Sequence, residues 1–176
     1  MIYKPIRASV LAVLPVVLGT LIAFGVNADQ ESAQLQPPAS EHLLLQAHAE
    51  GDQIYSCSPD GGRFSWTLKA PDAQLYSKDG KSFGRHFAGP SWKANDGSQI
   101  TGKATASAPS PDANSIPWLL VVVVSHSGDG VLAHVTYIQR INTKGGKAPA
   151  NGCDASHGGQ EARVPYSADY AFFEPR

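Results

Sequence analysis

Turn signals recur along this chain about every ten residues, and that spacing constrains the fold more than any other feature. Between the turns lie short stretches in which apolar and polar residues alternate, as in "RFSWTLK" from Arg63 to Lys69. Alternation with a period of two places one face of a strand toward a core. Asp79-Gly80 and Asp96-Gly97 are typical of tight reversals between antiparallel strands. The pattern predicts a single all-β domain, either an antiparallel β-sandwich or a flattened β-barrel.

The same pattern predicts individual strands. We expect "EHLLLQAHAEGDQIYSC" to form a β-hairpin that reverses at Glu50-Gly51. In "RFSWTLK" the alternation predicts that Phe64, Trp66 and Leu68 point inward. The valine-rich run "IPWLLVVVVSHS" disfavours a helix and predicts a central strand buried on both faces. The final segment, "EARVPYSADYAFFEP", is expected to form two short strands.

The first residues have the composition of a secretory signal peptide. Lys4 and Arg7 precede an apolar run that ends at Val26, and small residues follow it. We therefore expect residues 1–28 to be a signal peptide cleaved after Ala28, which places the protein in the periplasm or outside the cell and in contact with the membrane only during export. An uncleaved membrane anchor is the alternative.

Beyond the signal peptide, residues 29–41 are polar and contain Pro37 and Pro38, so we expect a flexible N-terminal arm. Residues 42–176 have the length of one β-rich domain with its own core. The chain has 14 basic and 15 acidic residues and no basic run, which argues against a nucleic-acid partner.

The chain contains two cysteines, Cys57 and Cys153. In an exported protein they should form one disulfide that closes a long loop and acts as a structural staple. A zinc site would need more thiolate or imidazole ligands close by.

Several spaced segments occur together in a characteristic order: "GDQIYSC", "GRHFAGPSWKANDGSQITG", "IPWLL", "VTYIQRINTKGGKAP", "GCD" and "VPYSADYAFF". In this combination, between about Leu43 and Phe173, the chain resembles a family of exported bacterial and fungal proteins known as domain of unknown function 3455. Phe87 departs from the family pattern, in which tyrosine is commoner at this position. The resemblance implies an exported single domain with Cys57 and Cys153 paired, and it implies no activity.

The stretch from Gly84 to Gly102 contains the first candidate site. Turn chemistry explains its glycines, but it does not require the aromatic and hydrogen-bonding side chains among them. Aromatic residues flanked by polar groups on loops are typical of binding sites. The ligand-binding candidates here are Arg85, His86, Trp92 and Asp96. The alternative is that the aromatic residues belong to the core at one end of the sheets.

A second candidate cluster lies in "YIQRINTKGGKAP", where Gln139 and Arg140 end a strand. The loop that follows contains Lys144 and Lys147 beside two glycines, and such a combination of cations and free backbone amides suits an anion. The alternative is an exposed, solvated loop held by the disulfide.

Catalytic patterns are weak. "GDGVLA", from Gly128, matches a dinucleotide-binding fingerprint, but the β-branched sequence after it predicts a hairpin turn and no helix. Ser125 and His126 are adjacent and would point to opposite faces of a strand, and no G-x-S-x-G elbow is present.

The histidines offer weak metal-ligand candidates. His126 and His134 flank a predicted turn and would face each other across a hairpin, and His86 as a third ligand would complete a zinc or copper site. The alternative is that all are ordinary surface or core histidines. We expect no cofactor.

The leading functional hypothesis is a non-catalytic binding module for a small molecule, a glycan or an exported protein partner. One alternative is a secreted hydrolase or metal-dependent enzyme that uses His86, His126 or Asp96. Another is an inhibitor of a secreted enzyme.

Denaturing mass spectrometry of the protein recovered from the exported fraction tests both export and pairing. Cleavage after Ala28 should give a polypeptide that begins at Asp29, lighter by its two thiol hydrogens. A mass that retains the apolar run contradicts the signal peptide, and alkylation of unreduced protein contradicts the disulfide.

Overall fold

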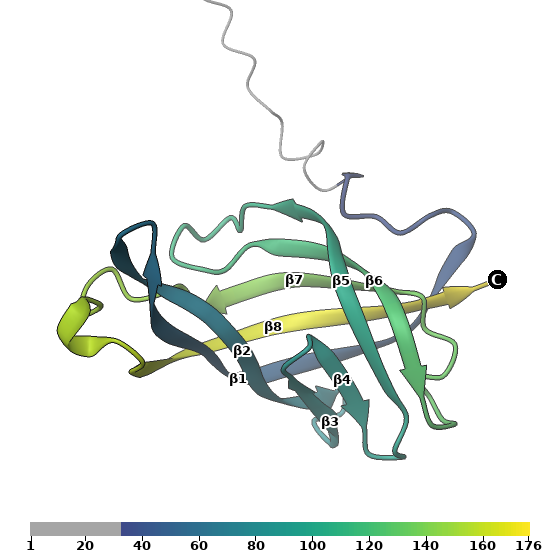
Figure 1. Ribbon diagram of the computed structural model, residues 1–176. Coiled ribbons are helices and arrows are strands. Elements are labelled where there is room, and N and C mark those ends of the chain that lie inside the picture. The colour runs from purple at the N-terminus through teal and green to yellow at the C-terminus, as the bar shows by residue number, and fades with distance from the viewer. Residues whose placement is uncertain (1–32) are drawn as a thin grey trace, which may run out of the picture.

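The computed structural model describes residues 33–176, so the predicted signal peptide lies outside the described residues. One antiparallel sheet closes on itself as an eight-stranded barrel (Figure 1). Each strand pairs with the next along the chain, and the last strand pairs with the first. Of the two predicted architectures, the barrel is therefore the one that forms. The elements are β1 (Glu41–Asp60), β2 (Arg63–Ser77), β3 (Ser82–Phe87), β4 (Ser91–Ala94), β5 (Gln99–Ala108), β6 (Trp118–Ser127), β7 (Tyr137–Gly145), the 3₁₀ helix η1 (Ala155–His157) and β8 (Glu161–Pro175).

The predicted reversals at Asp79-Gly80 and Asp96-Gly97 are confirmed. They connect β2 to β3 and β4 to β5, and their glycines have φ angles of 77° and 94°. Such positive φ angles are readily adopted by glycine alone. "GDGVLA" likewise lies in the connection between β6 and β7, and a strand follows it. No helix in residues 33–176 has the length and apolar character that a membrane span needs.

The predicted hairpin at Glu50-Gly51 is wrong, because β1 runs through this dipeptide as one strand of 20 residues. A Cβ at Gly51 would lie 2.2 Å from the carbonyl oxygen of Asp72 and 2.5 Å from the Cα of Ala73. The glycine thus permits a close approach between β1 and β2, which is the other common reason for glycine inside a strand. The C-terminal segment is also one strand, β8, and not two short ones.

The prediction that β6 is buried on both faces is wrong as well. Val121, which points into the barrel, is 2 % exposed, whereas Val124 farther along the strand is 59 % exposed. A barrel strand buries its inner face and leaves its outer face to solvent unless another segment covers it. The outward-facing Leu120 is buried because Leu35 packs against it.

Leu35 belongs to the expected flexible arm, and its side chain anchors this segment to the barrel, while most of its neighbours in residues 33–40 are exposed. Its side chain is 1 % exposed, in a cluster on the outer face of β5, β6 and β7 that includes Trp118 and Tyr137. Gln139 Nε2 donates to the Leu35 carbonyl oxygen at 3.0 Å. This segment is therefore a strap across the outside of the barrel.

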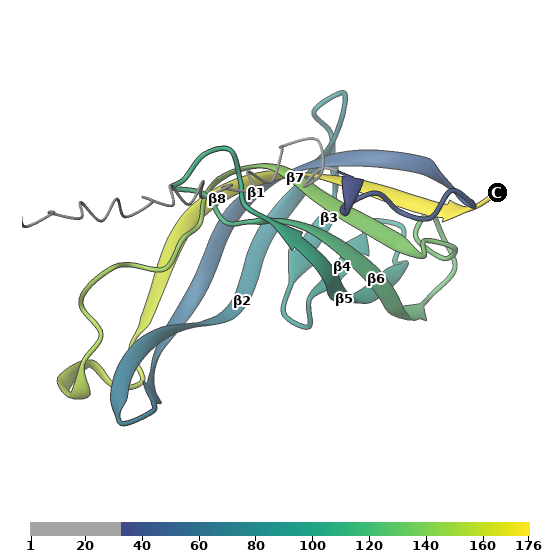
Figure 2. The ribbon, with the colours of Figure 1, turned by 90° about the horizontal axis from the view of Figure 1, so that it is seen from above.

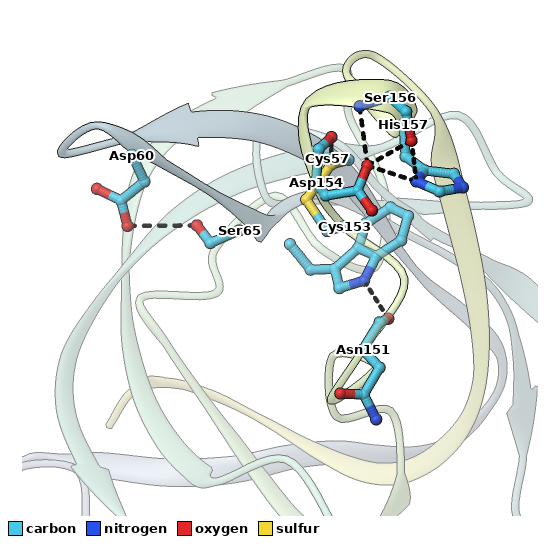
Figure 3. The surroundings of a disulfide bond; sticks show 9 residues. Cys57, Asp60, Ser65, Asn151, Cys153, Asp154, Ser156 and His157 are labelled. Atoms are coloured by element: carbon cyan, nitrogen blue, oxygen red, sulfur yellow. Dashed lines mark hydrogen bonds and ion pairs between the residues drawn. A yellow bond between two sulfur atoms is a disulfide. The ribbon is translucent and has the colours of Figure 1, made fainter.

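The tip of the β1–β2 hairpin extends beyond the barrel and lies beside the loop that contains η1 (Figures 1 and 2). The predicted Cys57–Cys153 disulfide is confirmed and joins residues 96 positions apart (Figure 3). Asp154 caps η1 by accepting a hydrogen bond from Ser156 N at 2.8 Å. Hydrogen bonds from the side chains of Ser156 and His157, together with this one, lower the pKa of Asp154 to about 2.

Phe64, Trp66 and Leu68 share the face of β2 that lies beside the buried Tyr55 and Cys57, so their predicted inward direction holds, but they lie outside the central core. Trp66 Nε1 donates to the Asn151 carbonyl oxygen at 2.9 Å, and the ring of Phe64 lies against Gly158. Leu68 is 52 % exposed. Trp66 and Phe64 pack on the loop between β7 and β8 that contains Cys153 and η1, here called the disulfide loop. The alternation of apolar and polar residues does not predict this contact.

The strap generates a stability prediction. Leu35→Ala should lower the free energy of unfolding by about 2–5 kcal/mol, because it removes a fully buried side chain and leaves a cavity on the outer sheet face. Leu43→Ala is the matched control, since Leu43 is 47 % exposed and its loss should cost less than about 1 kcal/mol. Urea denaturation of both variants measures the difference. Equal losses contradict a packed strap.

Candidate functional site

The barrel interior is filled at one end and hollow at the other. Leu132 and Val135, from the β6–β7 connection, are fully buried with Ile138 and Phe172 in the interior cluster. Farther along the barrel, a cavity of about 360 Å³ remains between strands β1, β2, β5, β6, β7 and β8 and the β3–β4 turn. This volume lies in the range of small-molecule binding sites. Its apolar lining includes Leu68, Ala70, Pro71, Pro90, Ala104, Leu119 and Val121.

Three rings form the floor of the cavity. His86 and Trp92 are cross-strand partners on β3 and β4, and their rings stack at 4.3 Å with 11° between their planes. Tyr170 of β8 meets both edge-on, at 5.2 Å from His86 and 5.7 Å from Trp92. All three side chains are at most 2 % exposed. The cluster is a rigid aromatic wall.

His86 is held as a neutral imidazole with a defined tautomer. Its Nδ1 lies 2.9 Å from the Ser91 carbonyl oxygen, which only accepts, so Nδ1 carries the proton. Burial, and to a smaller extent the positive charge of Arg140, lowers the pKa of His86 to about 3, although the hydrogen bond to Ser91 opposes the shift. His86 is therefore uncharged at every pH at which the protein is expected to work.

Polar atoms without partners gather around this cavity. Five buried side-chain atoms in residues 33–176 have no hydrogen-bond partner, and three of them, Trp92 Nε1, the Tyr170 hydroxyl and Gln53 Nε2, belong to cavity-lining residues. Native structures pair the great majority of such groups. Each unpaired group costs roughly 1–3 kcal/mol, so their concentration here calls for a physical reason.

Arg140 supplies the positive charge of the cavity. Its Nε and Nη2 atoms donate to the Pro117 carbonyl oxygen at 3.2 and 2.7 Å, which fixes the guanidinium and leaves its Nη1 side for another acceptor. Within the described residues no carboxylate forms an ion pair with it. Burial raises the pKa of Tyr170, and Arg140 and the Tyr166 hydroxyl, which lie close to its hydroxyl without a well-formed hydrogen bond, oppose this rise. The charge of Arg140 also opposes the rise in pKa that burial causes for Tyr166 and Tyr55. Arg140 thus lies among the interior tyrosines.

A larger hollow of about 500 Å³ lies on the outer face of β1, β2 and β8, and some of its polar groups pair with one another. His48 Nδ1 lies 2.7 Å from Asp169 Oδ1, and Asn142 Nδ2 donates to Asp169 Oδ2 at 2.8 Å. None of the described residues that line it carries a buried, unpaired polar atom, so this hollow is a weaker candidate than the interior cavity.

Comparison with known proteins gives one match. The model of a family described as "Protein of unknown function (DUF3455)" covers residues 38–174. The chain belongs to the DUF3455 family. No curated protein and no solved structure matches the chain. The matched range includes nearly the whole barrel, both cysteines and every residue of the cavity. The resemblance that the spaced segments indicated is confirmed.

In this DUF3455 protein the structure brings together half of the ligand-binding residues predicted from sequence. His86 and Trp92 from the first cluster and Arg140 from the second meet in the cavity, although many residues separate them in the chain. Antiparallel pairing around the closed ring produces this meeting, because β7 and β8 lie across the barrel from β3 and β4.

The other three predicted residues lie elsewhere and have structural partners. Arg85 points outward and donates to Asp72 at 2.9 Å, while Arg163 binds the other oxygen of the same carboxylate. Gln139 holds the strap, as described above. Asp96 accepts from Ser98 and from Val131 N at 2.8 Å, and these hydrogen bonds keep its pKa below the ordinary value. None of the three lines the cavity.

The three histidines considered as metal ligands do not meet. His126 Nε2 lies 2.7 Å from the Val135 carbonyl oxygen, and it shares an outer hollow with His134, whereas His86 is inside the barrel. In the described part of the chain, no three His, Cys, Asp or Glu side chains are placed to hold a metal ion.

Sequence reasoning missed Gln53 and Tyr170. The signal for Tyr170 was present, because Tyr166, Ala168, Tyr170 and Phe172 alternate along β8 and are all buried. The predicted break within this segment obscured that alternation. Gln53 carried no comparable signal, since an amide side chain in a strand is ordinarily exposed.

The buried imidazole predicts a specific sensitivity to acid. Below the ordinary histidine pKa of 6.5, the unfolded chain binds a proton that folded His86 does not bind until about pH 3. Stability should therefore fall as the pH drops through this window, and His86 should account for about 1 kcal/mol between pH 7 and 5.5. Urea denaturation at both pH values measures the fall, and His86→Phe should show correspondingly less of it. The same fall in the variant contradicts a neutral, buried His86.

Proposed function

We propose that this protein is an exported, non-catalytic binding protein that takes a small molecule into its barrel cavity. The observation that carries the proposal is the cluster of buried, unpartnered polar atoms around an apolar hollow, at Trp92, Tyr170 and Gln53. Small-molecule sites combine an apolar lining with a few convergent polar groups in this way. A ligand that pairs with these atoms recovers the free energy that their burial costs.

The chemistry of the cavity favours binding over catalysis. Among the described residues that line it, none is a serine, cysteine, aspartate or glutamate, so hydrolysis has neither an obvious nucleophile nor a carboxylate base. His86 is the one imidazole, and its Nδ1 proton is committed to the Ser91 carbonyl oxygen. Its low pKa makes it a poor general base near neutral pH.

The position of the aromatic residues favours a small molecule over a glycan or a protein partner. Trp92 is 2 % exposed, so its ring cannot form a surface platform for an extended ligand. Leu68, at the mouth of the cavity, is 52 % exposed and provides an apolar entrance. The predicted signal peptide and the disulfide support a site of action outside the cytoplasm.

Titration with the neutral dye N-phenylnaphthylamine, whose fluorescence rises in apolar surroundings, tests the proposal. The purified protein should bind one dye molecule per chain. Ala104→Trp should abolish binding, because Ala104 is exposed at the cavity wall and an indole there obstructs it. Ala150→Trp is the matched control, since it adds the same indole to the exposed disulfide loop. Absence of binding, or equal binding by both variants, contradicts a ligand cavity.

A further inference from the structure

The polar groups of the cavity define the chemical class of its ligand, and this step rests on the proposed function. We infer that the cavity selects an amphipathic oxyanion, a molecule with an apolar or aromatic body and a carboxylate, sulfonate or phosphate group directed toward Arg140. The inference follows from the polarity of the unpartnered atoms, from the charge at the cavity and from the separation of polar and apolar lining.

The unpartnered atoms are mainly donors. Trp92 Nε1 and Gln53 Nε2 carry hydrogens and have no lone pair to offer, and the Tyr170 hydroxyl donates as readily as it accepts. A ligand group that reaches any of them must present an acceptor lone pair. An oxyanion presents several acceptor lone pairs, whereas an ammonium has none and would leave the indole N–H unpaired.

The charge at the cavity is positive and uncompensated. Arg140 and Lys69 are its charged residues. Lys69 forms an ion pair with Glu161, but no carboxylate within residues 33–176 is in ion-pair contact with Arg140. The nearby acidic residues are engaged outside the barrel, where Asp52 and Asp72 both bind Arg163. An anion entering the cavity therefore meets a cation whose charge is not already neutralised.

The guanidinium is also preorganised. Its two hydrogen bonds to the Pro117 carbonyl oxygen fix its plane before any ligand enters. The remaining Nη1 side is a planar edge of N–H groups, the geometry with which arginine binds oxyanions through charge-assisted hydrogen bonds. Because the plane is already fixed, ligand binding costs little side-chain entropy.

The apolar part of the cavity accommodates the rest of the ligand. Pro71 and Leu68 come from β2, Pro90 comes from the β3–β4 turn, and Leu119 and Val121 come from β6. These side chains carry no hydrogen-bonding group, so a ligand that is polar throughout would lose hydration there without compensation. This excludes small inorganic anions as the preferred occupants and requires an apolar body.

A pair of dyes tests the inference. Anilinonaphthalene sulfonate carries the same phenylnaphthylamine skeleton as the neutral dye used above and adds one sulfonate. The wild-type protein should bind the sulfonate at least about tenfold more tightly, since a charge-assisted hydrogen bond in a buried site supplies that difference. Competition by dodecanoate and by dodecyl phosphate, each against dodecanol, then distinguishes a carboxylate ligand from a phosphate ligand.

Substitutions at Arg140 test whether its charge causes the preference for the sulfonate dye over the neutral dye. Arg140→Gln should reduce the sulfonate preference to near equality, and Arg140→Lys should retain part of it. Lys144→Gln is the matched control, because it removes one positive charge from an exposed position of the same strand. Tyr170→Phe, which keeps the ring and removes the hydroxyl, should weaken the sulfonate severalfold and leave the neutral dye unchanged.

Equal affinity for the two dyes in the wild-type protein, or an undiminished preference in folded Arg140→Gln, overturns the oxyanion inference and leaves the proposed cavity function standing. If Arg140→Gln does not fold, as judged by circular dichroism, the wild-type dye ratio and Tyr170→Phe decide. Absence of binding by both dyes, or binding that Ala104→Trp does not affect, contradicts the proposed function itself.

Discussion

Closure of the sheet between β1 and β8 is the constraint on which the rest of the structure depends. These strands pair along nearly their whole lengths, from Glu41 with Pro175 to Ser56 with Glu161. Closure leaves the sheet without a free edge and gives every strand an inner and an outer face. It also brings the two sequence regions that line the cavity, around Trp92 and around Arg140, to opposite walls of one interior.

Small residues on the long strands determine how that interior is filled. Ala47, Ala49, Ala73 and Ala168 are buried on the inner faces of β1, β2 and β8. They leave room for large rings, such as that of Trp92 from β4 and that of Phe172 from β8 itself. At one end the rings and the β6–β7 connection fill the space. At the other end a cavity remains, and three polar atoms of its lining residues are unpaired, which departs from the packing of an ordinary core.

The all-β class, the turns with Asp-Gly dipeptides and the disulfide could be predicted because each depends on local chemistry or on a count of cysteines. The continuity of β1 could not, since Gly51 reads equally as a turn residue and as a close approach between strands, and only the position of Asp72 decides. The same limit applies to the site. Aromatic residues among glycines indicated His86 and Trp92, but the sequence gives no distance between them and Arg140, and it does not show on which face Gln139 and Arg140 lie.

The alternation along β7 explains how one short segment contributes both to stability and to the lining of the cavity. Gln139 faces outward and holds the carbonyl of Leu35, whereas Arg140 faces inward and holds the carbonyl of Pro117. Pro117 precedes Trp118, which packs against Leu35 in the outer cluster. The strap packs on Trp118 and the guanidinium binds Pro117. The two therefore hold the point where the β5–β6 connection enters β6, from opposite sides of the sheet. The cation at the cavity is held in place by the packing that stabilises the outer face, so its geometry is set before any ligand of the proposed kind could enter.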